Sequence, residues 1–142
     1  LHVCIGVSDP VMKIENLHIA YKRARAAVQN ALRQALAIQY FDRMGLYRML
    51  YLIEDHALLY DLSDVPLAPV LEYDREHDAG YLETLESYLQ NGGSIKAMSE
   101  ELYVHRNTIM YRMANIKKLL GSDLTSPQDR FKYMVACMIR RM

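Results

Sequence analysis

The sequence lacks the features that mark secreted and membrane-spanning proteins. Its 142 residues contain only two cysteines, Cys4 and Cys137, which lie far apart and suggest neither a disulfide framework nor a metal pair. We expect both to be free, buried thiols. No apolar run approaches the roughly 18 residues that a membrane span needs, and no basic segment followed by an apolar one opens the chain. We therefore expect a globular cytoplasmic protein with no membrane segment.

The sequence also lacks the common signatures of catalysis and of metal binding. Its five histidines, at positions 2, 18, 56, 77 and 105, do not have the spacing of metal ligands. "GVSD" lacks the second glycine of a nucleophile elbow. A helix cap explains Gly92-Gly93, and a solvated polar linker explains the carboxylates of Asp74, Glu76 and Asp78. The sequence therefore predicts no catalytic residue, metal or cofactor, with a catalytic or ligand-binding fragment as an alternative.

Charge is distributed unevenly along a chain whose net charge is zero. With 51% hydrophobic and 24% charged residues, the composition is that of a globular protein. Residues 1–80 hold 8 basic and 11 acidic side chains, whereas residues 81–142 hold 9 and 6. The second part is therefore basic by three charges, which favours nucleic acid as its partner.

The first part of the chain predicts a strand, a helix and a second strand. "HVCIGVS" (2–8) alternates apolar and small residues, which is typical of a strand, and Asp9-Pro10 ends it. Apolar residues, mostly alanine, recur every three or four positions from about 14 to 37, which indicates one long helix. "AIQYF" (37–41) is a short β-prone run that completes the strand–helix–strand pattern.

The middle of the chain predicts helices that are interrupted by proline. "GLYRMLYLIEDHALLYDL" (45–62) has a helical pattern, with Gly45 as a break before it. Pro66 and Pro69 then leave at most a short helix in "LAPVLEYD" (67–74). The polar "EYDREHD" (72–78) is the expected place for a domain boundary.

From residue 81 the helical signals become regular. "YLETLESYLQ" (81–90) carries three leucines on one face and stops at Asn91-Gly92-Gly93. Ser94 is a suitable N-cap for a helix over 95–102. The turn "YVH" then leads into a helix that ends at Gly121.

A last helix is expected after Ser126 and Pro127, which supply an N-cap and a first-turn proline. The residues expected on its apolar face are Phe131, Met134, Val135, Met138 and Ile139. We therefore expect an α+β chain that is mostly α: a strand–helix–strand fragment, a helical connector and a helix-turn-helix bundle.

Two short helices joined by a three-residue turn match the helix-turn-helix, whose second helix enters the DNA major groove. That second helix begins in "HRNTIMYRM" (105–113). At about 100° per residue, one side carries Ile109, Met113, Ile116 and Leu120. The opposite side carries Asn107, Tyr111, Ala114 and Lys118, with Arg106 and Met110 at its border. The apolar stripe is expected to anchor the helix, and its N-terminal outer face to contact bases.

The polar side chains of this helix differ in their expected roles. Arg106 can pair with guanine and Asn107 with adenine, while Lys117 and Lys118 suit phosphates. We expect His105 to cap or pack rather than to contact bases. For Arg112, on the flank of the apolar stripe, a phosphate contact and an ion pair with an upstream carboxylate are equally open.

The stretch "VLEYDREHDAGYLETLESYLQNGGSIKAMSEELYVHRNTIMYRMANIKKLLG" resembles the C-terminal helix-turn-helix of PucR/CdaR-type bacterial transcriptional regulators. The resemblance covers roughly residues 70–142, and "VHRNT" followed by "YR" carries it most strongly. It implies binding of double-stranded promoter DNA by a recognition helix over about 105–120 that includes Arg106, Asn107, Thr108, Tyr111 and Arg112. We add Ser94, Lys117 and Lys118 to the expected DNA-binding set. Two positions depart from the pattern: Ser99 replaces a usual alanine, and Met110 replaces a polar or basic residue.

Upstream, "LHVCIGVSDP" and "YKRARAAVQNALRQALAIQYFDRMGLYRML" are similar to the tail of a degenerate GGDEF-like domain. We therefore expect three parts: the end of that domain (1–44), a helical connector (45–75) and the helix-turn-helix domain (76–142). The GGDEF signature itself is absent. The resemblance implies a piece of a longer regulator, an activator of a catabolic operon, with its small-molecule effector sensed upstream of Leu1.

We also expect two or more copies to act together, as a homodimer or a higher oligomer. Small helix-turn-helix modules usually bind paired half-sites, and the long alanine-rich helix could pack against a copy of itself. The alternative function is a dimerisation module that does not contact DNA.

Overall fold

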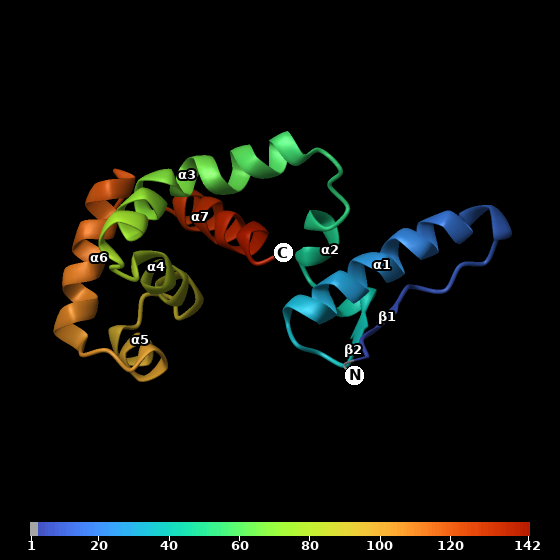
Figure 1. The fold of residues 1–142 in the computed structure, drawn as a ribbon, viewed down its shortest axis with the longest axis horizontal. Coiled ribbons are helices and arrows are strands. Elements are labelled where there is room, and N and C mark those ends of the chain that lie inside the picture. Colours follow the sequence, from blue (N-terminus) through green and yellow to red (C-terminus); the bar gives the residue numbers. More distant parts are fainter. Residues whose placement is uncertain (1–2) are drawn as a thin grey trace. The chain divides into compact units, whose positions relative to one another are not determined.

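The computed structural model describes residues 3–142 and contains two compact units (Figure 1). Unit 1 comprises the described residues up to Leu59 together with 141–142, and unit 2 comprises Tyr60–Arg140. The chain is mostly helical with one two-stranded sheet, as the sequence predicts. Within residues 3–142, no helix combines the length and the apolar character needed to cross a membrane.

Unit 1 is built on a strand–helix–strand motif, which confirms the predicted pattern. Strand β1 (Ile5–Val7) and strand β2 (Ile38–Tyr40) pair in parallel, with Ile5 opposite Ile38. Helix α1 (Leu17–Arg33) connects them. It ends earlier than expected because Ala35 adopts a left-handed conformation with φ of 53°. The predicted strand began at His2, which lies outside the described residues.

Helix α1 packs closely on the sheet because β1 contributes a glycine at the contact. A Cβ atom on Gly6 would lie 2.3 Å from the carbonyl oxygen of Ala24 and 2.5 Å from the amide nitrogen of Val28. The buried alanines of α1 are Ala20, Ala26, Ala27 and Ala31. These alanines pack inside unit 1, so a contact of α1 with a second copy, which stays a prediction, would have to use other residues of the helix.

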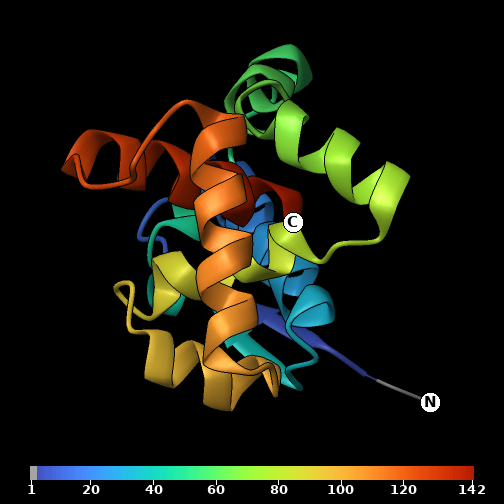
Figure 2. The same cartoon turned by 90° about the vertical axis from the view of Figure 1, so that its left-hand side faces the viewer.

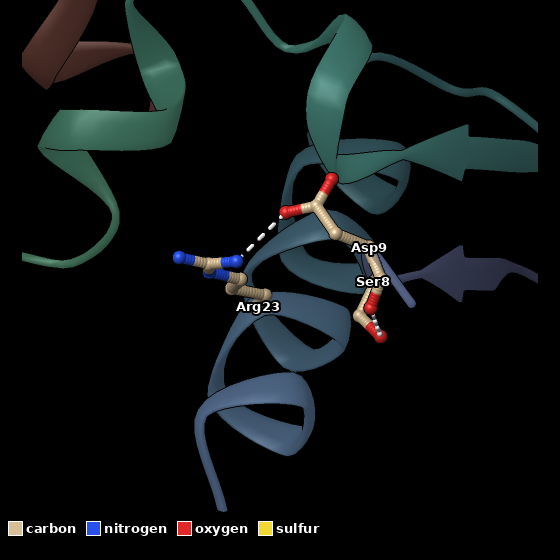
Figure 3. A network of polar contacts seen from close by, with 3 residues as sticks. All are labelled: Ser8, Asp9 and Arg23. Atoms are coloured by element: carbon tan, nitrogen blue, oxygen red, sulfur yellow. Dashed lines mark hydrogen bonds and ion pairs between the residues drawn. The ribbon is translucent and has the colours of Figure 1, made fainter. Parts of the chain in front are cut away.

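An ion pair fixes the end of β1 to α1 (Figure 3). An Nη1 atom of Arg23 lies 2.9 Å from a carboxylate oxygen of Asp9, the residue that begins the turn after β1. The guanidinium of Arg23 also lies 5.5 Å from the ring centre of buried Phe41. Ser8 donates its hydroxyl to the carbonyl of Asp9. The strand therefore ends where Asp9-Pro10 was expected to end it.

Helix α3 (His56–His77) runs through both prolines, and the prediction of a break there is wrong. The expected helix over 45–62 is instead divided into a short α2 (Tyr47–Leu50), an irregular stretch over 51–55 and the first residues of α3. Pro66 and Pro69 lack the N–H groups that would bond the carbonyls of Leu62 and Val65. Leu62 and Val65 are exposed, so water can bond these carbonyls.

The opposite face of α3 offsets the cost of the prolines. An interior proline costs roughly 3 kcal/mol. Leu67 and Val70 are fully buried in the core of unit 2, and each such burial contributes about 1.5–3 kcal/mol. The two effects are comparable, and the other hydrogen bonds of the helix keep it continuous. The boundary expected after residue 75 therefore falls inside a helix.

The remaining helices of unit 2 lie where the sequence predicts them. They are α4 (Tyr81–Gln90), α5 (Ile95–Leu102), α6 (Arg106–Leu120) and α7 (Pro127–Arg140). One core joins them to α3; its fully buried members are Leu67, Val70, Leu85, Met98, Ile109, Ile116, Leu124 and Ala136. Figure 2 faces the side of unit 2 along which α6, in orange, runs.

The buried face of α7 differs from the predicted one. Tyr133, Ala136 and Cys137 face the core, whereas Phe131 is 60% exposed and Met134 is exposed as well. The helix carries two apolar stripes, and the stripe with small residues is the one in the core. Cys137 is a buried thiol outside any disulfide, as expected, while Cys4 is only partly buried.

The close contact at Gly6 predicts a specific sensitivity in unit 1. Gly6→Ala should destabilise it by about 1–3 kcal/mol, because the added Cβ forces α1 and β1 apart. Denaturant unfolding combined with amide hydrogen exchange of α1 would measure this effect. Ser8→Ala, just after the same strand, is the control and should leave exchange unchanged. Equal protection of α1 in the parent and in Gly6→Ala would contradict the prediction.

The burial of α6 predicts a matching sensitivity in unit 2. Met113 is 4% exposed and lies in the core. Met113→Ala should lower the free energy of unfolding by about 2–5 kcal/mol through lost contacts and a cavity. Thermal melting would show this, with the exposed Ala114→Ser as control. A melting temperature equal to the parent's would mean that α6 is not anchored through this side chain.

Candidate nucleic-acid interface

The turn before α6 is held by hydrogen bonds at both ends. Ser99 of α5 donates its hydroxyl to the carbonyl of Val104 over 2.7 Å. The ring nitrogen Nδ1 of His105 accepts from the backbone N–H of Asn107 over 3.3 Å, which makes His105 the N-cap of α6. The capping interpretation of His105 is therefore confirmed. The serine at position 99, which departs from the family pattern, adds a hydrogen bond to the turn.

The inner face of α6 fixes the rotation of the helix about its axis. Ile109, Met113 and Ile116 are buried in the core of unit 2, as the helical spacing predicts. They share this core with Leu85 of α4 and Met98 of α5. Because these positions cannot leave the core, the opposite face of α6 must point to solvent.

The outer face of α6 gathers most of the predicted DNA-binding side chains. The structure exposes Arg106, Asn107, Thr108, Tyr111 and Lys118. Tyr111 is 65% exposed and Met110 is 57% exposed. A guanidinium, an amide, a phenol and a thioether therefore share the N-terminal part of one solvent-facing surface. Such groups can pair with base edges or contact the thymine methyl group.

Arg112 turns instead toward the start of α4. Its Nη1 donates to the hydroxyl oxygen of Thr84 over 3.3 Å, and that hydroxyl donates to the carbonyl of Gly80 over 2.7 Å. A Cβ atom on Gly80 would lie 3.2 Å from the same Nη1. Among the described residues, the hydrogen-bond partner of Arg112 is thus a hydroxyl group and not a carboxylate, while a phosphate contact by Arg112 stays a prediction.

A second hydrogen bond also ties α6 to the start of α4. The side-chain amide of Asn115 donates to the phenol oxygen of Tyr81 over 3.0 Å. Burial raises the pKa of Tyr81, and the hydrogen bond from Asn115 acts in the opposite direction. The ring of Tyr81 stacks on Tyr73 of α3, with 4.7 Å between ring centres. Three helices therefore meet at Tyr81.

The N-terminus of α4 is capped by a carboxylate from α3. Asp74 accepts from the backbone N–H of Tyr81 over 2.8 Å and from that of Leu82 over 2.7 Å. A carboxylate at a helix N-terminus accepts hydrogen bonds from the free N–H groups there, and its negative charge interacts favourably with the positive end of the helix dipole. The interpretation of Asp74 as part of a solvated linker is therefore wrong.

Lys117 and Ser94 also have partners within unit 2. The Lys117 ammonium lies 5.4 Å from the ring centre of Tyr88 in α4. The Ser94 hydroxyl accepts from the backbone N–H of Ala97 over 3.4 Å and caps α5, as predicted. Ser94 stays exposed at the N-terminus of that helix. Lys118 therefore belongs to the outer face of α6, whereas the ammonium of Lys117 contacts the ring of Tyr88 in α4.

Sequence reasoning missed one residue at this surface. Tyr103, in the turn before α6, is 95% exposed and has a left-handed backbone with φ of 54°. In so short a turn, the side chain of Tyr103 does not reach the core and stays in solvent. This feature of "YVH" could have singled out Tyr103 as a second phenol next to the outer face of α6.

Comparisons with known proteins agree with this geometry. Residues 81–139 match the family of the PucR C-terminal helix-turn-helix domain. The purine catabolism regulatory protein of Bacillus subtilis (strain 168) is 28% identical over an alignment of 144 positions. The alignment covers 99% of this chain and 26% of the relative. The proline-responsive transcriptional activator PutR of the same organism is 27% identical, over 98% of this chain and 34% of the relative.

A third relative covers less of the chain. The DNA-binding transcriptional activator AdeR of Bacillus subtilis (strain 168) is 26% identical over 72% of this chain and 24% of the relative. The chain spans between about a quarter and a third of the length of these curated relatives. The matched domain contains α4, α5, α6 and nearly all of α7, and so includes every side chain on the outer face of α6. Residues 81–139 therefore form a PucR C-terminal helix-turn-helix domain.

Proposed function

We propose that the chain binds double-stranded promoter DNA by placing the outer face of α6 in the major groove. The observation that carries this proposal is the exposure of Arg106, Asn107 and Tyr111 on a helix whose opposite face is buried. Arg106 would pair with guanine O6 and N7, and Asn107 with adenine N6 and N7. Met110, beside them, would contact a thymine methyl group.

The phosphate contacts come from residues around this helix. Lys118 and Thr108 lie exposed on α6 and would contact the DNA backbone. Ser94 sits at the N-terminus of α5, where free backbone N–H groups favour a phosphate. Tyr103 would add a hydrogen bond from the turn. These contacts set the register of α6 on the duplex without selecting a sequence.

Arg112 and Lys117 serve a different role in this proposal. Arg112 is hydrogen-bonded to Thr84, and Lys117 lies against the ring of Tyr88. Both contacts link α6 to α4. We assign them to positioning of the recognition helix, with a phosphate contact by Lys117 as a secondary role near the end of α6.

The rest of the chain fits a larger regulator of gene expression in the cytoplasm. The parallel pairing of β1 with β2 supports a GGDEF-like domain that ends near residue 44. A connector over 45–75 would follow, with its part of α3 packed in the core of unit 2, and then the DNA-binding part over 76–142. Two of the relatives carry the word activator in their names, so we propose activation of a catabolic operon. A small metabolite sensed elsewhere in the protein would control two or more copies bound to adjacent half-sites.

We infer no catalytic role for the chain. The similarity to transcriptional regulators supports this inference. The chemistry of the outer face of α6 is that of recognition by hydrogen bonding.

Substitutions at the N-terminal end of α6 should change sequence preference without unfolding the protein. Arg106→Ala or Asn107→Ala should each cost about 1–3 kcal/mol on the preferred site and relax preference at one base pair. The preferred site would first be selected by the parent from random duplexes. Affinity and thermal melting would then be measured side by side, with the exposed amide change Gln128→Ala as control. Unchanged affinity and selection in both variants, with normal melting, would overturn the assignment of α6.

Lys118 should instead act on all DNA sequences alike. Lys118→Ala should weaken binding to preferred and random duplexes equally and reduce the slope of log affinity against log salt by about one. Titrations at several salt concentrations would measure both quantities. Lys13→Ala, an exposed lysine of unit 1, is the matched control. A salt slope equal to that of the parent would exclude a phosphate contact by Lys118.

A further inference from the structure

Unit 2 contains an apolar groove between α3 and α7, away from the residues of α6. Leu62, Val65 and Pro66 line it from α3, and Phe131 and Val135 line it from α7; its volume is about 420 Å³. Two charged residues complete the lining, Asp61 on α3 and Lys132 on α7. We call these seven residues the α3/α7 groove.

The apolar residues of the groove are not needed for the core of unit 2. Helix α3 turns Ser63, Leu67 and Val70 inward, and Val65 on its other side is 52% exposed. Helix α7 turns Tyr133, Ala136 and Cys137 inward and leaves the ring of Phe131 exposed. Exposed apolar side chains gathered in one groove and rimmed by charged residues are a feature that interaction sites share.

The two walls of the groove are held in a fixed relation. An ion pair joins Asp64 of α3 to Arg140 of α7. Beneath the groove, Leu67 and Ala136 are fully buried in the shared core. A partner therefore meets a formed surface and does not have to order it, which lowers the entropic cost of docking.

We propose that the α3/α7 groove is the surface on which a second copy of this chain docks. The charges of the groove select this occupant. A two-fold axis that lays α3 of one copy along α7 of the other brings Asp61 opposite Lys132 of the second copy, and the same pair forms a second time by symmetry. A surface with one charge of each sign around an apolar centre is complementary to itself.

Lys132 is available for this contact. Its ammonium lies 4.9 Å from the ring centre of its neighbour Tyr133, and the residue stays exposed. The docking proposal rests on the proposed function in one respect: a second copy is needed because helix-turn-helix modules usually bind paired half-sites. It leaves the outer face of α6 uncovered in each copy, because no residue of that face lines the groove.

The test is a charge exchange, measured on the 142-residue chain without DNA. In Asp61→Lys, two lysines would face each other at each contact, and in Lys132→Asp, two aspartates would. Each variant alone should dimerise at least about tenfold more weakly than the parent, because attraction becomes repulsion at two places. Sedimentation equilibrium over a range of concentrations would give the dissociation constants.

The decisive measurement is an equal mixture of Asp61→Lys and Lys132→Asp. A lysine-bearing copy then faces an aspartate-bearing copy at both contacts, so dimers should return in the mixture at parental strength. The double variant with both changes in one chain should also dimerise. Because both positions are exposed, all variants should melt like the parent at concentrations low enough for the parent to be monomeric.

An apolar substitution tests the same groove independently of charge. Val65→Glu should abolish dimerisation, while Ala68→Glu, exposed on the same helix outside the groove, should not. A monomeric parent would overturn the proposal, and so would dimers that persist in Val65→Glu or a mixture that fails to restore them. If the parent is monomeric and the Val65→Glu variant melts at a lower temperature than the parent, another part of the same chain fills the groove. Since no DNA is present, loss of DNA binding in other variants would bear only on α6.

Discussion

The burial of one stripe of α6 determines how the other side chains of the recognition helix are presented. Ile109, Met113 and Ile116 each occupy the core of unit 2, and a helix has only one rotation that keeps all three there. That rotation carries Asn107 and Tyr111 outward. The polar face needs no contacts of its own to stay in place, so its side chains remain available to a ligand. Stability and the proposed recognition of DNA thus belong to opposite sides of the same fifteen residues.

A network of hydrogen bonds adds directional control to this apolar anchoring. Asp74 fixes the first turn of α4, and Arg112 and Asn115 then join α6 to that same turn. Apolar packing alone tolerates small slides along a helix axis, whereas hydrogen bonds lose strength steeply with distance and angle. Because the partners of Arg112 and Asn115 are a hydroxyl and a phenol, the contacts do not place a second buried charge beside the guanidinium.

Much of unit 2 could be predicted from the sequence because its helix ends are encoded locally. Ser94, His105 and Gly121 each mark a boundary through their own side chain or backbone preference. The errors concern choices that neighbours decide. Whether α3 survives Pro66 depends on which carbonyls reach water, and which apolar stripe of α7 is buried depends on the helices it meets. The role of Arg112 depends on the left-handed Gly80 of another helix, which no spacing within α6 reveals.

The turn between α5 and α6 has a consequence for the speed and the cost of complex formation. The hydrogen bonds from Ser99 and to His105 already hold this segment in one conformation. A flexible turn would lose roughly 1–2 kcal/mol of backbone entropy for each residue ordered on contact with a ligand. In this chain the turn is already ordered when the protein folds, so this entropic cost is not incurred again when a ligand binds.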